Sequence, residues 1–301
     1  MKIPVGVVGY GNLGRSVVEN LQNDKTFQLE AVFSRRDLPI ATSCSDILKL
    51  KDKIELLFVC GGSQNELEGQ TNFLIKHFNL IESYDNHNRL KSHIQDLDIA
   101  AKEHQKIALC SFGWDPGLFS LMRGLFDSLG QNPYSFWGKG LSQGHTQAIK
   151  NIDGVIDGLQ FTLPNKDIIA KIKNGESVKV SKDFHKRLCY VVCPKEKRAE
   201  IEHKIKSMPD YFLGYETEVK FVSQESLDKL KSFAHKGQVL TSNNTMNFSL
   251  NLPSNPKFTA NVMTTFARAY PKLKEEKKFG AHDIFDIPMK YVLKEEPYRY
   301  L

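Results

Sequence analysis

The sequence predicts an α/β fold in which an N-terminal doubly wound parallel sheet is followed by a second, α+β domain. Three observations lead to this prediction. The chain has 301 residues, more than one compact core usually holds. Strand-like and helix-like segments alternate up to Gly113. Beyond that residue the segments are richer in strands and less regular.

The first part of the chain is predicted to form a Rossmann domain over residues 1–116. Short apolar runs predict strands, and helical spacing of apolar residues predicts helices. The run at 55–60 is almost wholly apolar, which is typical of a parallel strand buried on both faces. We expect strands at 3–8, 27–33, 55–60, 80–84 and 106–110, and helices at 12–22, 66–78 and 90–105.

The second domain is expected over residues 117–252, and residues 253–301 are expected to form a C-terminal helix and tail that return to the first domain. A helix at 116–129 is predicted to have Asp115 as its N-cap and Pro116 at its first position. Further strands are expected at 158–163, 188–192, 216–222 and 238–240, and a helix at 255–270.

The composition favours a globular protein of the cytoplasm. Hydrophobic residues make up 41% and charged residues 25%, and the net charge of 41 − 35 = +6 comes without any nucleic-acid-binding motif. We find neither an apolar run of membrane-spanning length nor a signal peptide. The five cysteines are odd in number and lack zinc-ligand spacing, so we expect reduced thiols and no metal.

A glycine-rich motif lies between the first predicted strand and the first predicted helix, and it reads Gly9-Tyr10-Gly11-Asn12-Leu13-Gly14. Gly9 is predicted to make the tight turn, Gly11 to admit the pyrophosphate of a dinucleotide, and Gly14 to allow close packing of helix on strand. The helix N-terminus supplies free N–H groups. A purely structural glycine turn is the alternative, but the strand and helix on either side favour a dinucleotide site.

The end of the second predicted strand indicates which dinucleotide binds. An NAD site would carry Asp or Glu there to bond the ribose 2′-hydroxyl. This chain has Ser34, Arg35 and Arg36 instead. Guanidinium groups bond phosphate oxygens bidentately, so the pair predicts NADP, with a solvated arginine pair as the alternative.

The third strand ends in Cys60-Gly61-Gly62-Ser63. Ligands of parallel sheets bind at the carboxyl ends of the strands, and small residues there let a cofactor lie close. We therefore add these four residues to the predicted cofactor site, although glycines at this position also serve ordinary turns.

Distinctive motifs occur in order along nearly the whole chain. Among them are VGYGNLGRS (8–16), FSRR (33–36), YDNH (84–87), GWDPG (113–117), FWG (136–138), GLSQGH (140–145), TLP (162–164), HKR (185–187), MPDYF (208–212) and GYE (214–216). Together they resemble the meso-diaminopimelate dehydrogenase family. The resemblance implies reversible, NADP-dependent oxidative deamination of the D-centre of meso-2,6-diaminopimelate by a cytosolic homodimer, in lysine and peptidoglycan precursor biosynthesis.

Asp85 and Asp115 both follow first-domain strands, where a reacting amine could be held and deprotonated. The resemblance implies that they face the D-centre amine, and either could assist deprotonation. It further implies that the substrate is bound by Trp114, Trp137, Gln143 and Gly144 around that centre, and by Thr162, Arg187 and His235, with Asn255 nearby, around the distal carboxylate. We assign the second domain to substrate binding and dimerisation on the same basis.

Other interpretations of these residues are open. Asp115 could simply cap a helix, Asp85 could belong to a turn, and Arg187 and His235 could lie on the surface or in packing. The segment 235–247 departs from a glycine-rich stretch of the family pattern, which puts the role of His235 in question. Alternative functions are another NADP-linked amino acid dehydrogenase, a dihydrodipicolinate-type reductase, or a non-catalytic NADP-binding sensor.

Overall fold

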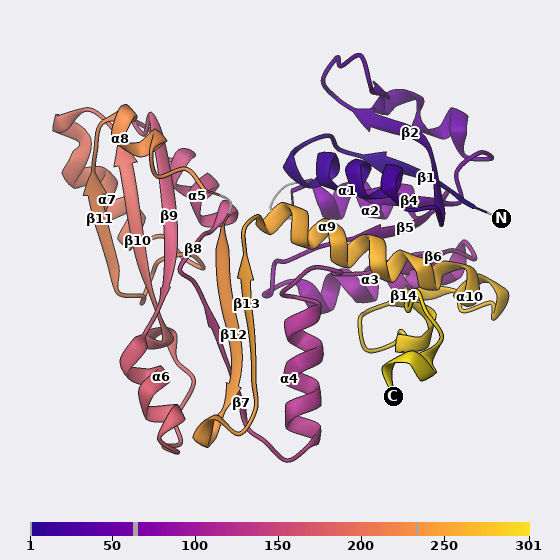
Figure 1. Cartoon of the computed structure of the whole chain (residues 1–301). Helices are drawn as coiled ribbons and strands as arrows, with labels where there is room; N and C mark the ends of the chain where they lie inside the picture. Colours follow the sequence, from indigo (N-terminus) through magenta and orange to yellow (C-terminus); the bar gives the residue numbers. More distant parts are fainter. Residues whose placement is uncertain (1, 63–65, 233) are drawn as a thin grey trace. The chain divides into compact units, whose positions relative to one another are not determined.

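The computed structural model describes residues 2–62, 66–232 and 234–301, which form two compact units (Figure 1). The first unit comprises residues 1–121 and 256–301, and the second comprises residues 122–255. The second unit is thus inserted between two parts of the first. The boundary that follows residue 121 falls inside helix α4 (Leu118–Ser128).

The first unit is built on a seven-stranded parallel sheet with the strand order β14-β6-β5-β4-β1-β2-β3. The chain runs from β1 to β3 on one side and then returns to place β4 on the other side of β1. The predicted α/β class and parallel sheet are confirmed. The strands are β1 (Ile3–Val8), β2 (Phe27–Ser34), β3 (Thr42–Ser43), β4 (Leu56–Val59), β5 (Asn79–Glu82), β6 (Ile107–Leu109) and β14 (Gly280–His282).

Helices cover both faces of this sheet because successive strand residues point to opposite sides. In β4, Leu56 and Phe58 join a core with α1 (Asn12–Asn23), α9 (Asn255–Phe266) and α10 (Tyr270–Glu275). Leu57 and Val59 join the other core with α2 (Leu67–Leu74) and α3 (Leu90–Glu103). All four β4 residues are fully buried, as the apolar run predicts.

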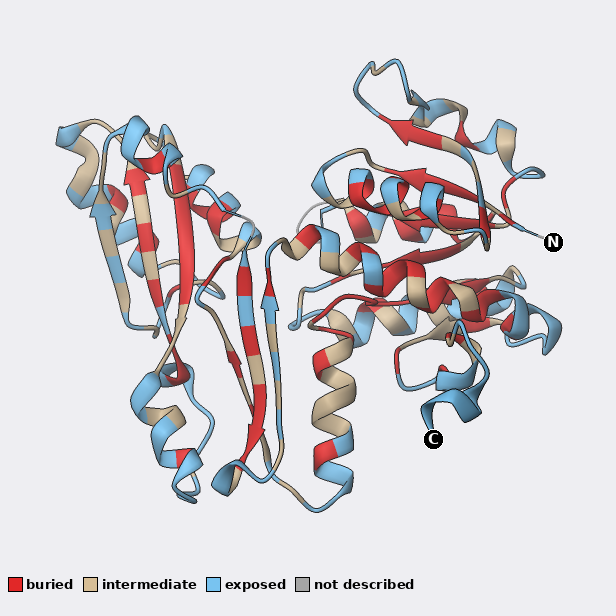
Figure 2. Cartoon of the chain, viewed as in Figure 1, coloured by how far each residue is buried: buried red, intermediate tan, exposed pale blue. Residues whose placement is uncertain are grey.

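The second unit contains two smaller sheets. A four-stranded sheet has the order β11-β10-β9-β8, and an antiparallel three-stranded sheet has the order β13-β12-β7. Figure 2 shows that β12 is mostly buried, whereas alternate residues of the edge strand β13 are exposed. The strands are β7 (Pro133–Trp137), β8 (Gly140–Leu141), β9 (Asp157–Pro164), β10 (His185–Val192), β11 (Thr217–Phe221), β12 (His235–Thr241) and β13 (Asn247–Leu252).

The helices of the second unit pack on these sheets through a few apolar side chains each. Ile149 of α5 (Gln143–Lys150) and Ile201 of α7 (Arg198–Lys206) share a core with Cys189 and Val191 of β10. Leu227 of α8 (Gln224–Asp228) packs with Leu159 and Phe161 of β9. Ile172 of α6 (Lys166–Lys173) packs with aromatic residues of β7.

One local prediction is wrong, and one strand of the sheet was not predicted. Helix α4 begins at Leu118, and Asp115 and Pro116 lie in a turn instead of at a helix N-cap and N1. The turn ends at Gly117, whose φ of 125° is not helical, and the Gly113 N–H donates to the Pro116 carbonyl at 3.0 Å. Strand β14 was not predicted, because three residues that begin with glycine carry no strand pattern of their own.

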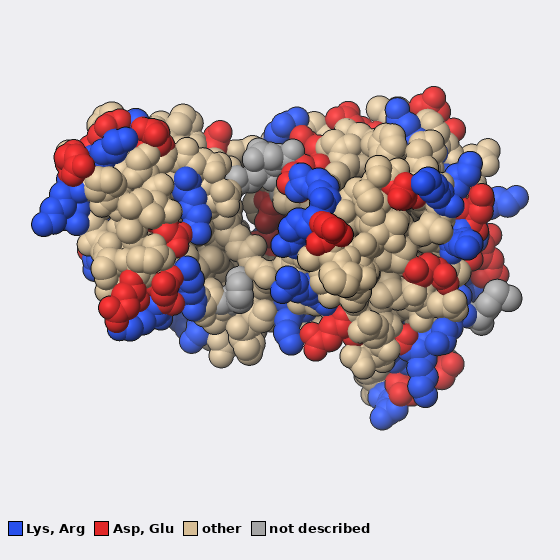
Figure 3. Space-filling model, turned by 90° about the horizontal axis from the view of Figure 1, so that it is seen from above, with Lys and Arg blue, Asp and Glu red and all other residues tan. Residues whose placement is uncertain are grey.

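Charged side chains are mixed on the surface. On the face shown in Figure 3, Lys and Arg side chains are interspersed with Asp and Glu in each unit. Such mixing is typical of a solvated surface and gives no continuous basic stripe on that face. Throughout the described ranges, no helix has the length and apolarity needed to cross a membrane.

Candidate active site

The glycine-rich turn of the first unit has a geometry that requires its glycines. Gly9 has a φ of 94°, and its N–H donates to the Phe33 carbonyl at 2.9 Å. A Cβ atom on Gly14 would lie 1.8 Å from the Gly9 carbonyl oxygen, so helix and turn can pack this closely only with glycine. A Cβ atom on Gly11 would meet nothing within 4 Å. The turn is therefore closed on its inner side and open at Gly11.

Helix α1 begins immediately after this opening. Gly11 is the N-cap residue, has extended backbone geometry and provides no side-chain cap. Asn12 and Leu13 form the first turn of the helix, whose leading N–H groups have no intrahelical acceptors. An uncapped helix N-terminus beside an open glycine fits the pyrophosphate of a dinucleotide.

Two arginines follow β2 beside the glycine-rich turn. Arg36 donates from Nη2 to the Tyr10 carbonyl at 2.6 Å, which brings its guanidinium against the turn. The buried Ser34 hydroxyl accepts from the Arg36 N–H at 3.0 Å and fixes the backbone there. Arg35 is 69% exposed and pairs with Glu66 at 2.6 Å, a partner that the sequence did not predict. No carboxylate occupies residues 34–36, so the strand end lacks the Asp or Glu that would bond a ribose 2′-hydroxyl.

The end of β4 lies against the same turn. The Cys60 N–H donates to the Val8 carbonyl at 2.8 Å, and a Cβ atom on Gly9 would lie 3.1 Å from the Cys60 carbonyl oxygen. Burial raises the pKa of the Cys60 thiol to about 12, so this cysteine is a packing residue and not a nucleophile. Gly61 and Gly62 follow, and Ser63 lies outside the described residues. A Cβ atom on Gly61 would lie 2.4 Å from Gln70 Oε1, whereas one on Gly62 would meet nothing within 4 Å, so this strand end is open at Gly62.

The two predicted carboxylates follow the next two strands of the sheet. Asp85 comes after β5 and is exposed, while Asp115 comes after β6 and is half-buried. Trp114 is nearly buried and packs edge-on against Phe119, with ring centroids 5.1 Å apart. Because β1, β4, β5 and β6 are neighbours in one parallel sheet, the glycine-rich turn and both aspartates lie along one carboxyl edge.

In the second unit, Arg187 and Thr162 are directly opposite each other on β10 and β9. Arg187 is 8% exposed and donates from Nη1 to the Thr162 hydroxyl at 2.8 Å. Its guanidinium lies 4.2 Å from the ring centroid of Tyr215, a cation–π contact that the sequence reasoning missed. Burial lowers the pKa of Arg187. Tyr215 and Cys189, and no described carboxylate, act on the charge of Arg187, and a buried guanidinium in such surroundings suits an anionic ligand.

His235 and Trp137 are held by close packing within the second unit. A Cβ atom on Gly140 would lie 2.3 Å from the His235 ring, so glycine at 140 makes room for this imidazole. His235 Nδ1 donates to the Lys236 carbonyl at 2.8 Å, and burial lowers the pKa of the ring. Trp137 donates its backbone N–H to His185 Nε2 at 2.9 Å. Burial and then Arg187 lower the pKa of His185 to about 3, which keeps that acceptor neutral.

Gln143 and Gly144 occupy the first turn of α5. Ser142 caps this helix, and its hydroxyl lies 2.8 Å from Nδ1 of His145. The His145 ring packs edge-on against Tyr211, with centroids 5.2 Å apart, and so joins two of the most distinctive sequence motifs. Burial and then Arg187 lower the pKa of His145 to about 3. Asn255, the first residue of α9, is half-buried at the end of the second unit.

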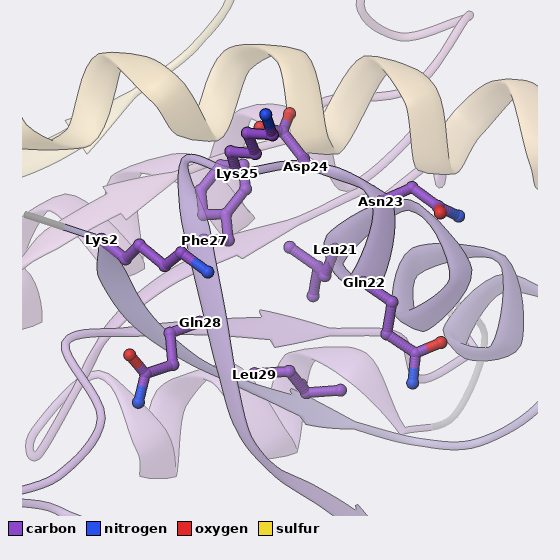
Figure 4. A pocket seen from close by; sticks show the side chains of 9 residues that line it. All are labelled: Lys2, Leu21, Gln22, Asn23, Asp24, Lys25, Phe27, Gln28 and Leu29. Atoms are coloured by element: carbon purple, nitrogen blue, oxygen red, sulfur yellow. The ribbon is translucent and has the colours of Figure 1, made fainter.

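Two surface pockets lie apart from these residues. The pocket in Figure 4 lies in the first unit where α1 ends and β2 begins, and Lys2, Asp24 and Gln28 are among its lining residues. A groove in the second unit runs beside Gly138, Lys236 and Ser249. Neither contains a predicted site residue. Over residues 2–62, 66–232 and 234–301, no group of three or more His, Cys, Asp or Glu could hold a metal ion.

Comparison with known proteins identifies the family. Residues 113–253 match the model of the diaminopimelic acid dehydrogenase C-terminal domain. The chain is 39% identical to meso-diaminopimelate D-dehydrogenase of Ureibacillus thermosphaericus, over 98% of this chain and 97% of that protein. It is 36% identical to the Corynebacterium glutamicum enzyme of the same name, over 95% of this chain and 93% of that protein.

Solved structures agree with this assignment. The C. glutamicum diaminopimelate dehydrogenase in complex with diaminopimelate superposes with a TM-score of 0.94 and 35% identity, covering 99% of this chain and 98% of that chain. An engineered D-amino acid dehydrogenase bound to NADP+ gives a TM-score of 0.91 at 33% identity, with the same coverage. The resemblance and the fold class predicted from the sequence are both confirmed, and this chain belongs to the meso-diaminopimelate D-dehydrogenase family.

Proposed function

We propose that this protein catalyses the NADP-dependent oxidative deamination of the D-centre of meso-2,6-diaminopimelate. Water replaces the amine, so the products are L-2-amino-6-oxopimelate, ammonia, NADPH and a proton, and the keto acid cyclises to tetrahydrodipicolinate. The reaction is reversible. The observation that carries the proposal is the shared carboxyl edge of one sheet, where the dinucleotide turn and two aspartates follow neighbouring strands.

The residues of the first unit fit NADP. The open space at Gly11 and Gly62 and the uncapped start of α1 leave room for a pyrophosphate. Arg35 and Arg36 carry the charge that a 2′-phosphate requires, and Ser34 holds the Arg36 backbone. When bound, NADP accepts the hydride from the substrate carbon. The chain's own residues fix the substrate and move its protons.

Asp85 and Asp115 are proposed to receive the ammonium group of the D-centre. Deprotonation of that ammonium supplies the lone pair that stabilises the carbon as hydride departs, and a carboxylate within hydrogen-bond reach can take the proton. Trp114 is already fixed by packing on Phe119 and lines this region in the proposal. Trp137, Gln143 and Gly144 of the second unit are also proposed to bind the substrate, an assignment that rests on the family resemblance.

The distal carboxylate of the substrate is proposed to bind Arg187, Thr162 and His235, with Asn255 nearby. Arg187 is buried and already oriented by Tyr215 and Thr162, so little side-chain entropy is lost on binding. A charge-assisted bond from a buried guanidinium is stronger than one from a mobile surface lysine. We assign residues 117–252 to substrate binding and dimerisation, and residues 1–116 to NADP binding.

The proposed function is tested by NADPH formation from purified protein with the meso, LL and DD isomers separately. Activity with the meso isomer alone supports the proposal. Activity with a different D-amino acid but none with diaminopimelate would indicate an altered specificity, and NADP binding without turnover of any isomer would indicate a sensor. The protein is proposed to be a cytoplasmic homodimer in lysine and peptidoglycan precursor synthesis, and light scattering in solution measures its oligomeric state.

A further inference from the structure

A buried carboxylate stands at the end of β5, three residues before Asp85. Glu82 is 0% exposed. Its Oε1 accepts from the Ser111 N–H at 3.0 Å and lies 3.2 Å from His93 Nε2, and its Oε2 accepts from the Tyr84 N–H. A fully buried charge is expensive unless each oxygen is satisfied, and here two backbone donors and an imidazole satisfy it.

The two backbone donors belong to different loops. Tyr84 directly precedes Asp85 in the loop that follows β5, and Ser111 lies at the start of the segment that leads from β6 to Trp114 and Asp115. The Phe112 N–H also donates to the Glu82 backbone carbonyl at 2.9 Å. Glu82 thus joins, through its carboxylate and its carbonyl, the two loops that carry the proposed catalytic aspartates.

One of these loops is held in an unfavourable conformation. Ser111 has a φ of 61°, in the left-handed region that residues other than glycine seldom adopt. Ser111 is 5% exposed, and its hydroxyl has no hydrogen-bond partner among the described residues. The side chain therefore does not account for this backbone geometry. Its N–H donates to Glu82, and its carbonyl accepts from the Gly113 N–H at 3.1 Å, so these two bonds hold the conformation. Such strain persists where surrounding contacts determine the conformation, and it concentrates at functional sites.

The other side of Glu82 is rigid. His93 on α3 is almost fully buried and stacks on the Tyr84 ring, with centroids 4.0 Å apart and planes at 23°. The Tyr84 hydroxyl donates to Glu68 at 2.9 Å, and Glu68 pairs with Arg89 at 3.1 Å. The carboxylate therefore cannot shift toward either loop without disturbing packed rings. Both loops are thus hydrogen-bonded to a carboxylate whose own position is fixed by packing.

We infer that Glu82 is a positioning residue for the reaction, and that its carboxylate sets the separation of the loops that carry Asp85 and Asp115. The inference rests on the proposed function, in which those aspartates receive the reacting ammonium. Glu82 itself is buried beneath the loops and touches no substrate in this assignment. Small displacements of catalytic groups reduce turnover strongly. Among the described residues, the glycine-rich turn after β1 makes no hydrogen bond to the Glu82 carboxylate.

The first test is Glu82→Gln. One end of a carboxamide is a donor and cannot accept an N–H, so either the Tyr84 or the Ser111 N–H loses its acceptor. We expect kcat with meso-diaminopimelate to fall about 100-fold and its KM to rise, while the Kd for NADP stays within about threefold. Glu82→Asp keeps the carboxylate and is expected to restore kcat to within about tenfold of wild type.

Glu68→Gln is the matched control. Glu68 accepts from the Tyr84 hydroxyl, but among the described contacts it accepts no N–H of either loop. We expect its kcat to change by no more than about twofold. A folded E82Q protein that binds NADP and keeps kcat/KM within about threefold of wild type overturns the inference. So does an E68Q protein whose kcat falls as far as that of E82Q.

Ser111→Gly supplies a second, independent test. Glycine adopts a positive φ without cost, so it should do little in the wild type and recover about tenfold in kcat when combined with E82Q. Equal effects in both backgrounds would contradict the inference. If E82Q alone does not fold, the double variant is compared with S111G, and equal kcat/KM values overturn the role of Glu82.

The wild type is assayed beside every variant. A wild type that binds NADP but does not oxidise meso-diaminopimelate refutes the proposed function. An active wild type whose activity does not depend on Glu82 refutes only this inference.

Discussion

The glycine-rich turn of the first unit and the cluster of Arg187, Thr162 and Tyr215 in the second unit are both proposed to bind anionic groups, and they are built by different means. The turn uses mainly the backbone: Gly9, Gly11 and Gly14 shape a helix N-terminus, and the Arg36 guanidinium lies against the turn. The Arg187 cluster uses buried side chains, with Thr162 and Tyr215 fixing one guanidinium. A backbone site depends on the space around each glycine, and a side-chain site depends on partners distant in sequence.

The largest effect is expected from Gly14→Ala. Its Cβ would fall 1.8 Å from the Gly9 carbonyl oxygen, so helix and turn must separate. We expect unfolding to become easier by about 3 kcal/mol or more and NADP binding to be lost, measured by urea titration and fluorescence. Gly11→Ala is the matched control, because its Cβ meets nothing in the protein. It should keep wild-type stability and lose only NADP affinity, and a destabilised G11A protein would contradict the division of roles.

Arg187→Met is expected to have the next largest effect. It removes a buried charge that no described carboxylate neutralises and keeps most of the side-chain volume. We expect kcat/KM for meso-diaminopimelate to fall by roughly 3 kcal/mol, or about 100-fold, with the Kd for NADP unchanged. Arg187→Lys, which lacks the planar fork, should recover only part of this loss. If NADP affinity fell as far as kcat/KM for the substrate, Arg187 would not belong to a substrate site separate from the NADP site.

Replacing Arg35 and Arg36 by Gln should change cofactor choice with a smaller loss. Arg36 is held against the turn by its bond to the Tyr10 carbonyl, whereas Arg35 is bonded to Glu66. We expect KM for NADP to rise about 30-fold and KM for NAD to change by less than about threefold, since only the 2′-phosphate is affected. Steady-state kinetics with both cofactors measures the ratio. If KM changed equally for NADP and NAD, the proposal that this strand end binds the 2′-phosphate would be wrong.

The last prediction concerns the pH dependence of stability and distinguishes the second unit from the first. Burial lowers the pKa of His145 and His185 from 6.5 to about 3, and both belong to the second unit. The unfolded chain therefore binds more protons than the native protein between these values, so stability falls as pH decreases from 6.5 toward 3. Urea titrations at pH 7, 5 and 4 test this, and His185→Gln should reduce the slope.

The same contrast explains what could be predicted from the sequence. The glycine turn and the buried β4 strand depend on neighbouring residues and were predicted correctly. Strand β14 forms only because Gly280–His282 pairs with β6, which is remote in sequence. Tyr215 beneath Arg187 and Ser111 against Glu82 likewise depend on tertiary contacts. The predicted cap at Asp115 failed because the φ of Gly117 interrupts the helix before it can begin.

The insertion of residues 122–255 within the first unit has a consequence for synthesis on the ribosome. Strands β1 to β6 emerge first, but β14 and helices α9 and α10, which complete that sheet and one of its faces, emerge last. The edge of β6 and the apolar face beneath α9 thus stay exposed during translation of the whole inserted segment. Nascent chains released before residue 280 present an open sheet edge, the kind of surface that chaperones bind and that drives aggregation.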